Sequence, residues 1–218
     1  MAPQSAVLER SAGALYVVII TAGLTSELAL RGPLMASADP AAAIAAHLPA
    51  FRASLLGDLT MILADIALAL IFFALLRRIS EGLARAAMVL RLMQAALIGM
   101  GLVLLAGVPI VLPQDPALAL HLTQMHAAGY DIGLIFFGVN SLIMAVLLSR
   151  AGGVPKIIAA GIGGSGLVYI AGGLARIAAP NLLAPLQYAY ALPMLAETAL
   201  ALWLLITGRI MGRIVARP

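Results

Sequence analysis

The chain has 218 residues, of which 63% are hydrophobic and 10% are charged, and its mean hydropathy is +1.09. Soluble domains are typically about 45–50% apolar and about 25% charged, so this composition excludes a soluble domain and predicts an integral membrane protein. The net charge of +4 comes from basic residues that flank apolar segments and does not indicate nucleic-acid binding, and the absence of Cys excludes disulfides, thiolate metal sites and cysteine nucleophiles.

Six apolar segments approach or exceed the length of about 20 residues that a helix needs to cross a bilayer. They lie at residues 11–30, 54–76, 86–108, 120–148, 157–178 and 187–208. We therefore predict an all-α, polytopic integral membrane protein, a single transmembrane domain over residues 1–218 with its six helices in one bundle. Between the first two spans, Asp39 and Pro40 are typical of the N-cap and first residue of a short helix.

Basic residues are concentrated on one side of the predicted spans. Nine lie on one side, namely Arg10, Arg77, Arg78, Arg85, Arg150, Lys156, Arg209, Arg213 and Arg217. Three lie on the other side, namely Arg31, Arg52 and Arg176, and Arg91 falls within the third span. Because cytoplasmic loops carry an excess of Lys and Arg, we predict a multi-pass membrane protein with both termini cytoplasmic.

The fifth span contains the sequence GIGGSG at residues 161–166, which matches the pattern G-x-G-x-x-G. A nucleotide-binding interpretation requires a preceding strand and the start of a helix. Neither is compatible with the middle of a membrane span, whereas small residues allow two helices to pack closely. We therefore interpret this motif as a helix-packing surface.

Polar residues within the spans can be placed by depth, at about 1.5 Å per helical residue from the cytoplasmic basic residues. Asp65 lies 12 residues from Arg77, which is roughly 18 Å. Glu197 lies 12 residues from Arg209, at the same depth. The residues expected near the bilayer midplane are Asp65, Arg91, Gln94, Asn140, Tyr169 and Glu197. The residues expected nearer the outer face are Glu27, Arg52, Asp58, His126, Tyr130, Asp131, Arg176 and Tyr188.

Helical periodicity assigns these residues to faces. Asp58 and Asp65 are seven residues apart and share a face of the second span. A second shared face, on the fourth span, consists of His126, Tyr130, Gly133 and Asn140. His121 and Asp131 point about 140° away from His126, at about 100° per residue. The fourth span is polar on more than one side, which predicts that it lies well inside the bundle or packs on another subunit.

Acidic residues outnumber the basic residues expected near them. The acids are Glu27, Asp58, Asp65, Asp131 and Glu197, and the bases are Arg52, Arg91 and Arg176. At least two acids should therefore lack a cation, and an unpaired carboxylate in an apolar surrounding takes up a proton. We expect Arg52 to pair with Asp58. We expect Arg91 to pair with Asp65 or Glu197, and the two acids to share a proton.

These residues resemble a known pattern. Its first half comprises RSAGALY at 10–16, FR at 51–52, Asp58, Asp65 and Arg91, and its second half comprises HAAGYDIGLIFFG at 126–138 and ETALALW at 197–203. Together they resemble the bacterial membrane family described as domain of unknown function 4386, over residues of about 10 to 208. The resemblance implies a six-span helical protein and no established activity.

Three functions remain open. The first is binding of a small apolar or amphipathic, lipid-like molecule, with acid–base isomerisation or cyclisation as the candidate chemistry. Asp65 and Glu197 would be the acid and base, and Arg91 would hold one of them ionised. The ligand-binding residues would be Glu27, Arg52, Asp58, His126, Tyr130, Asp131 and Asn140. The first alternative is a proton-coupled small-molecule transporter. The second is a non-catalytic accessory subunit, in which the ion pairs and the side chains of Gln94 and Asn140 serve only to fix the register of the helices.

No metal or cofactor is expected. His126 with Asp58, Glu27 or Asp131 offers oxygen and nitrogen ligands, but no recognised metal-ligand spacing is present. Retinal on a Schiff base is excluded because the single lysine, Lys156, lies at a loop edge. The expected partners are membrane lipid and the small ligand, with a homo-oligomer left open and no nucleic acid.

Overall fold

The structure is a computed structural model that describes residues 3–212, so Arg213 and Arg217 of the basic residues lie outside the described range. The prediction of an all-α fold is confirmed, because the described residues form helices and no strand. The α-helices are α1 (Pro3–Leu24), α2 (Gly32–Met35), α3 (Pro40–Ala46), α4 (Leu48–Leu76), α5 (Glu81–Val111), α6 (Pro116–Ala151), α7 (Lys156–Ala178), α8 (Leu183–Leu186) and α9 (Ala191–Thr207). The other helical segments are the π-helix η1 (Thr25–Arg31) and the 3-10 helices η2 (Pro180–Leu182) and η3 (Gln187–Tyr190).

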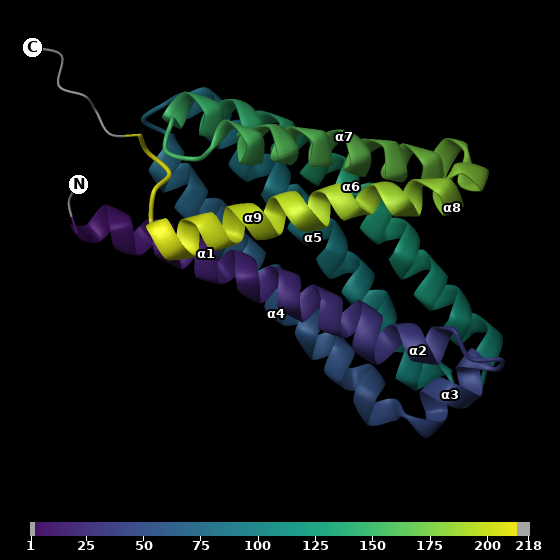
Figure 1. The fold of residues 1–218 in the computed structure, drawn as a ribbon. Helices are drawn as coiled ribbons and strands as arrows, with labels where there is room; N and C mark the ends of the chain where they lie inside the picture. Colours follow the sequence, from purple (N-terminus) through teal and green to yellow (C-terminus); the bar gives the residue numbers. More distant parts are fainter. Residues whose placement is uncertain (1–2, 213–218) are drawn as a thin grey trace, which may run out of the picture.

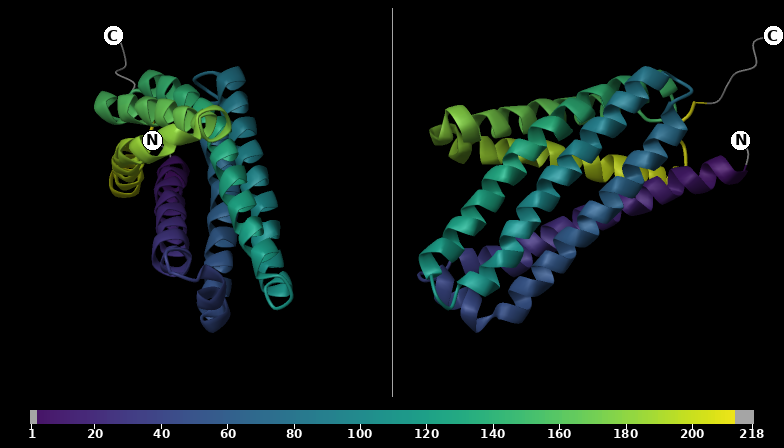
Figure 2. Two further views of the ribbon diagram at one scale, coloured as in Figure 1. Left: turned by 90° about the vertical axis from the view of Figure 1, so that its right-hand side faces the viewer. Right: turned by 180° about the vertical axis from the view of Figure 1, so that it is seen from behind.

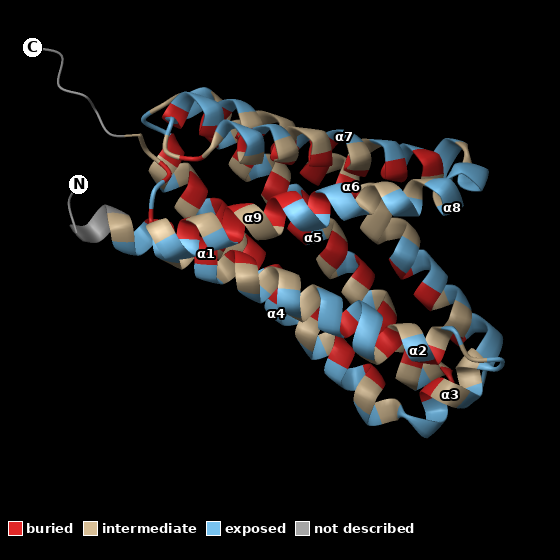
Figure 3. Ribbon diagram, viewed as in Figure 1, coloured by how far each residue is buried: buried red, intermediate tan, exposed pale blue. Residues whose placement is uncertain are grey.

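Six helical stretches are long and apolar enough to cross a membrane, so the protein is a multi-pass membrane protein. They are Ala6–Met35, Leu48–Leu76, Glu81–Val111, Pro116–Ala151, Lys156–Ala178 and Pro180–Thr207. Buried and exposed residues alternate along each long helix (Figure 3), as expected of helices that pack on one face and meet lipid on the other. Large apolar side chains such as Met100, Val103 and Ile110 are exposed on the outside.

Capping residues explain several helix boundaries. The short helix predicted after Asp39 is confirmed as α3, and the Asp39 carboxylate accepts a hydrogen bond from the Ala42 N–H. Ser80 and Asp115 cap α5 and α6 in the same way. At the other ends of helices, Gly152 and Gly208 adopt positive φ values of 72° and 55°, which glycine tolerates without a steric cost.

The first membrane helix does not end near residue 30, as the sequence suggested. It continues through the π-helix η1 and α2 to Met35, and the Gly32 N–H donates to the Glu27 carbonyl oxygen five residues back. A π-turn is wider than an α-turn, so it changes the direction of the side chains that follow. Arg31 is therefore a buried residue of the membrane helix, and its assignment to the outer loop was wrong.

The helices pack tightly at one end of the molecule and diverge toward the other (Figures 1 and 2). The start of α1 and the end of α9 lie at the tight end, which we call the closed half. An apolar core that includes Leu68, Leu147 and Leu200 fills this half. Toward the other end, α7 and α9 separate from α1 and α4, and we call this part the open half.

Glycines bring the helices together in the closed half and at its boundary. A Cβ on Gly13 of α1 would lie 2.4 Å from the Leu205 backbone nitrogen of α9. A Cβ on Gly166 of α7 would lie 2.6 Å from the Gly138 carbonyl oxygen of α6. The interpretation of the GIGGSG motif as a packing surface is confirmed, because Gly161, Gly164 and Gly166 all face neighbouring helices.

Candidate functional site

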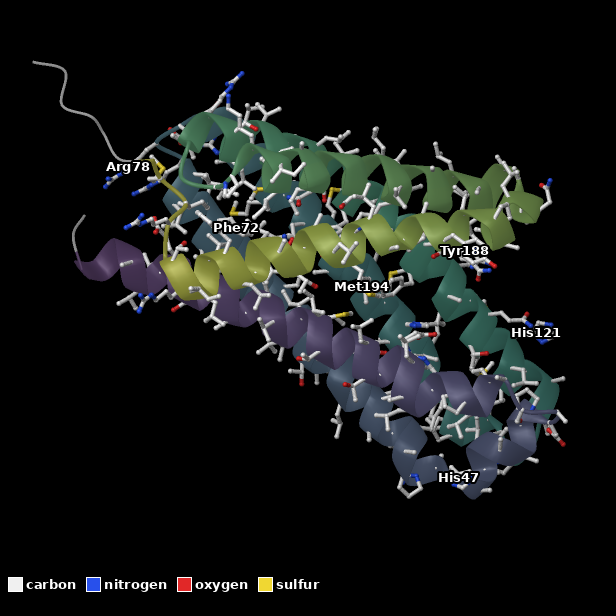
Figure 4. The ribbon with its side chains drawn as sticks, in the orientation of Figure 1. His47, Phe72, Arg78, His121, Tyr188 and Met194 are labelled. Atoms are coloured by element: carbon white, nitrogen blue, oxygen red, sulfur yellow. The ribbon has the colours of Figure 1, made fainter. Side chains whose placement is uncertain are left out.

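A cavity of about 630 Å³ lies in the open half, and all six membrane-spanning helices contribute to its wall. This volume is within the range of about 300–1,000 Å³ that is usual for small-molecule sites. Leu28 of η1 and Met194 of α9 line the cavity with half or more of their side chains exposed, so the cavity reaches the surface between these helices. Tyr188 and His121 lie at the same end of the molecule, on either side of the divergence (Figure 4).

Arg91 and Asp65 form a buried ion pair at the inner end of the cavity. The Arg91 Nη2 and Nε atoms lie 2.6 and 2.7 Å from the Asp65 Oδ1 atom. Three aromatic rings surround the guanidinium, with centroids 4.9–5.9 Å from its carbon, and they belong to Tyr16, Phe72 and Phe137. The aromatic faces attract the cation, and this buried pair joins the helices α4 and α5.

Glu197 lies on α9 beside Tyr169 of α7. The Tyr169 hydroxyl donates a hydrogen bond of 2.5 Å to the Glu197 Oε1 atom. The Tyr169 ring packs against Phe137 and Tyr190, at centroid distances of 5.2 and 5.8 Å. The prediction that Asp65 and Glu197 would share a proton finds no support in this geometry, because Asp65 is held by Arg91 and Glu197 by Tyr169.

Arg31 occupies the position that the sequence assigned to Arg52. Its Nη1 atom lies 2.8 Å from the Asp58 Oδ2 atom, and its Nη2 atom lies 2.6 Å from the Glu27 Oε2 atom. Ser54 accepts a third hydrogen bond, of 3.2 Å, from the same side chain. Arg52 is exposed and does not line the cavity, so the predicted Arg52–Asp58 pair is wrong. Arg31 takes the place predicted for Arg52 because the π-helix η1 extends the first membrane helix and directs Arg31, one turn after Glu27, toward α4.

His126 and Tyr130 line the cavity on α6, and their ring centroids are 6.2 Å apart. The His126 Nδ1 atom is buried without a hydrogen-bond partner, at a point where a Cβ on Gly101 of α5 would lie 2.9 Å from it. The predicted shared face is confirmed in part, since His126, Gly133 and Asn140 are buried while His121 is exposed. Glycine at position 101 leaves the space that the imidazole occupies.

The remaining predicted site residues lie at the rim and outside the cavity. Asp131 lines the cavity and pairs with Arg176 of α7 at 2.6 Å. Asn140 does not line the cavity, which departs from its prediction as a ligand-binding residue. Its Nδ2 atom donates to the Ala87 carbonyl oxygen, so it bridges α6 to α5 as the alternative interpretation expected. Gln94 lines the cavity, and its buried Oε1 atom has no partner.

The five acids predicted for the spans all line the cavity, but only one of them lacks a cation among the residues that the structure describes. Arg31 pairs with both Glu27 and Asp58, Arg91 with Asp65, and Arg176 with Asp131. Glu197 has no basic nitrogen within 4 Å among residues 3–212, so the expectation of at least two such acids was wrong, because Arg31 pairs with two carboxylates at once. The four-residue spacing of Glu27 and Arg31 was the signal in the sequence that could have revealed it.

The described residues contain no group of three or more His, Asp or Glu side chains that could hold a metal ion. The groups that could act on a ligand are therefore carboxylates, phenols, guanidinium groups and one imidazole. Among them, Glu197 beside Tyr169 and the imidazole of His126 could accept and return a proton without first breaking an ion pair.

The comparisons with known proteins agree with this architecture. A family model described as Domain of unknown function (DUF4386) matches residues 11–208, which confirms the resemblance seen in the sequence. No curated protein and no solved structure matches the chain.

Proposed function

Because the chain belongs to the DUF4386 family, whose description assigns no function, we propose a function from the cavity: the protein binds a small lipid-like molecule within the membrane. The observation that carries this proposal is the cavity of about 630 Å³, which is predominantly apolar and reaches the surface between α1 and α9. A ligand would enter there from the bilayer. Its apolar body would contact side chains such as Ile20, Met61 and Leu134, and its polar end would reach Glu197 and Tyr169.

The chemistry that such a site would support is acid–base isomerisation or cyclisation. The Glu197 carboxylate would remove a proton from one carbon of the ligand and return it at another, while the Tyr169 hydroxyl stabilises the charge that develops. This isomerisation needs no oxidant, reductant or second substrate. The Arg91–Asp65 ion pair would stay intact during the reaction, because the aromatic rings hold the Arg91 guanidinium in place.

Binding can be tested by the retention of tritium-labelled 1-dodecanol on the protein in phosphatidylcholine nanodiscs, with empty nanodiscs subtracted. Ala127 lines the cavity on α6, so Ala127→Trp should fill part of it and abolish the protein-dependent retention. Met125 lies on the lipid-facing side of the same helix, so Met125→Trp is the matched control and should retain the label. Equal retention by the wild-type protein and Ala127→Trp would exclude the cavity as the binding site.

A second candidate, proton-coupled transport, is favoured by the interrupted helices beside the cavity. The π-helix η1 contributes Glu27 and Arg31 to the wall, and η3 contributes Tyr190 just before α9. Helix breaks of this kind are typical of transport sites. Alternating access would require the closed half to open. If the protein is a transporter, a maleimide should therefore label both Ala127→Cys, in the cavity, and Ala69→Cys, in the closed half. A binding protein with a fixed bundle predicts labelling of Ala127→Cys alone.

We further propose that the chain lies in the bacterial inner membrane with both termini cytoplasmic. The support is the concentration of basic residues at the end that holds Arg78, opposite the end that holds His47 (Figure 4). The chain has no Cys, so single cysteines can report the orientation. A membrane-impermeant maleimide added to intact cells, with the outer membrane made permeable, should label His47→Cys and not Arg78→Cys. The reverse pattern would invert the orientation.

A further inference from the structure

We infer that the ligand of this cavity is an amphiphile with a single positively charged ammonium head, which Glu197 binds. This inference rests on the proposed binding function and adds the chemical class of the ligand. Five carboxyl side chains line the cavity, whereas three arginines do, so acidic side chains outnumber basic ones in the wall. The carboxylates are those of Glu27, Asp58, Asp65, Asp131 and Glu197, and the arginines are Arg31, Arg91 and Arg176.

The arginines are already occupied, which disfavours an anionic ligand. Each has a nitrogen within 2.6–2.8 Å of a carboxylate oxygen. A fatty acid or a lipid phosphate would have to displace one of these carboxylates and leave it without a cation in an apolar surrounding. Charges buried without a partner are costly, so the exchange would bring little or no gain.

Glu197 provides the position where a cation would gain most. Its carboxylate is buried, has the Tyr169 hydroxyl as its hydrogen-bond donor, and has no basic nitrogen within 4 Å among the described residues. A ligand ammonium placed there would supply the missing counter-charge. Coulombic attraction is stronger at such a site than in water because the effective dielectric constant is lower.

The aromatic pair formed by Tyr169, which contacts Glu197, and Tyr190 is a second feature that suits an ammonium group. Tyr169 and Tyr190 pack edge to face with their ring centroids 5.8 Å apart, and both line the cavity with Glu197. Aromatic faces attract cations, and they do so for quaternary ammonium groups that cannot donate a hydrogen bond. Apolar side chains such as Ile19, Ile62 and Met194 complete the wall and would contact an alkyl chain.

The test compares three twelve-carbon probes that differ in charge, namely dodecyltrimethylammonium, 1-dodecanol and dodecanoate. Their affinities are measured on the protein in phosphatidylcholine nanodiscs, with empty nanodiscs subtracted. We expect the wild-type protein to bind dodecyltrimethylammonium at least about tenfold more tightly than 1-dodecanol, and dodecanoate most weakly. Glu197→Gln should remove the preference for the cation, so that the variant binds dodecyltrimethylammonium and 1-dodecanol with similar affinities, and thermal unfolding near the wild-type temperature shows that the variant is folded.

Glu81 is an exposed acid on α5 that lies outside the cavity, so Glu81→Gln is the matched control and should keep the preference. Equal affinities for the cation and the alcohol in the wild-type protein would overturn the inference, as would a preference for the cation that persists in Glu197→Gln. Either result would leave the proposed binding function standing. The absence of retention of all three probes would refute the binding function itself.

Discussion

The closed half and the open half of the bundle are built from the same helices but are held together differently. In the closed half, glycines allow the backbones to touch, as Gly13 of α1 does against α9, and apolar side chains fill the rest. In the open half, two groups of helices diverge, one formed by η1, α2, α4 and α5 and the other by α7 and α9. Paired charges line the space between the two groups. Lipid is as apolar as leucine, so close packing and not the hydrophobic effect holds membrane helices together.

The difference indicates a division of roles. The closed half fixes the relative positions of the helices, and this allows the open half to hold a cavity with polar groups in it. The Arg91–Asp65 pair lies at the boundary, because Phe72 (labelled in Figure 4) belongs to the apolar core of the closed half while Phe137 lines the cavity, and both rings contact Arg91. Substitutions in the two halves should therefore have separable effects on stability and on binding.

The largest expected loss of stability comes from Arg91→Met. It leaves the buried Asp65 carboxylate without a cation, which typically costs about 3–5 kcal/mol. Arg85 on the same helix pairs with Glu81 at the surface, so Arg85→Met is the matched control and should cost about 0.2–0.5 kcal/mol. Thermal unfolding in detergent measures both. Similar losses in the two variants would show that the Arg91 pair does not stabilise the boundary.

Gly13→Ala tests the closed half alone. The added methyl group would lie 2.4 Å from the Leu205 nitrogen, so α1 and α9 must separate, at a cost of about 1–3 kcal/mol. Gly99 on α5 has open space around it, and Gly99→Ala should be neutral or slightly stabilising. If Gly13→Ala unfolds at the same temperature as the wild-type protein, the helix contact is not a source of stability.

Glu197→Gln should change stability by about 1 kcal/mol or less, since the amide oxygen can still accept the Tyr169 hydrogen bond and no cation loses its partner. Asp65→Asn is the corresponding change at the other buried acid, and it should cost several times as much because it leaves Arg91 without a full counter-charge. Thermal unfolding of the two variants side by side gives the difference. Equal losses of stability in the two variants would mean that the folded state depends on an ionised Glu197 as it does on Asp65.

The sequence was sufficient to predict the six helices, because a bilayer imposes length and apolarity that can be read directly. It also predicted the Arg91–Asp65 pair as one of two choices, since both residues lie in the spans and Asp65 has few other partners. It signalled the Glu27–Arg31 pair through their four-residue spacing, but it did not predict the contact of Arg31 with Asp58. Residues 25–31 form a π-helix that packs against α4, where Gly57 lies against the Ser26 side chain. This packing between two helices depends on the tertiary structure and cannot be read from the local sequence.

The smallest expected effect comes from Asn140→Leu. The Asn140 amide donates a hydrogen bond to the Ala87 carbonyl oxygen, and bonds of this kind between membrane helices are worth about 0.6 kcal/mol on average. Leucine has the same branching as asparagine and is larger, so the change should remove the bond without opening a cavity. Thermal unfolding should therefore show a small decrease, while retention of 1-dodecanol stays at the wild-type level because Asn140 does not line the cavity. A loss of binding without a loss of stability would mean that α6 transmits changes from the boundary into the open half.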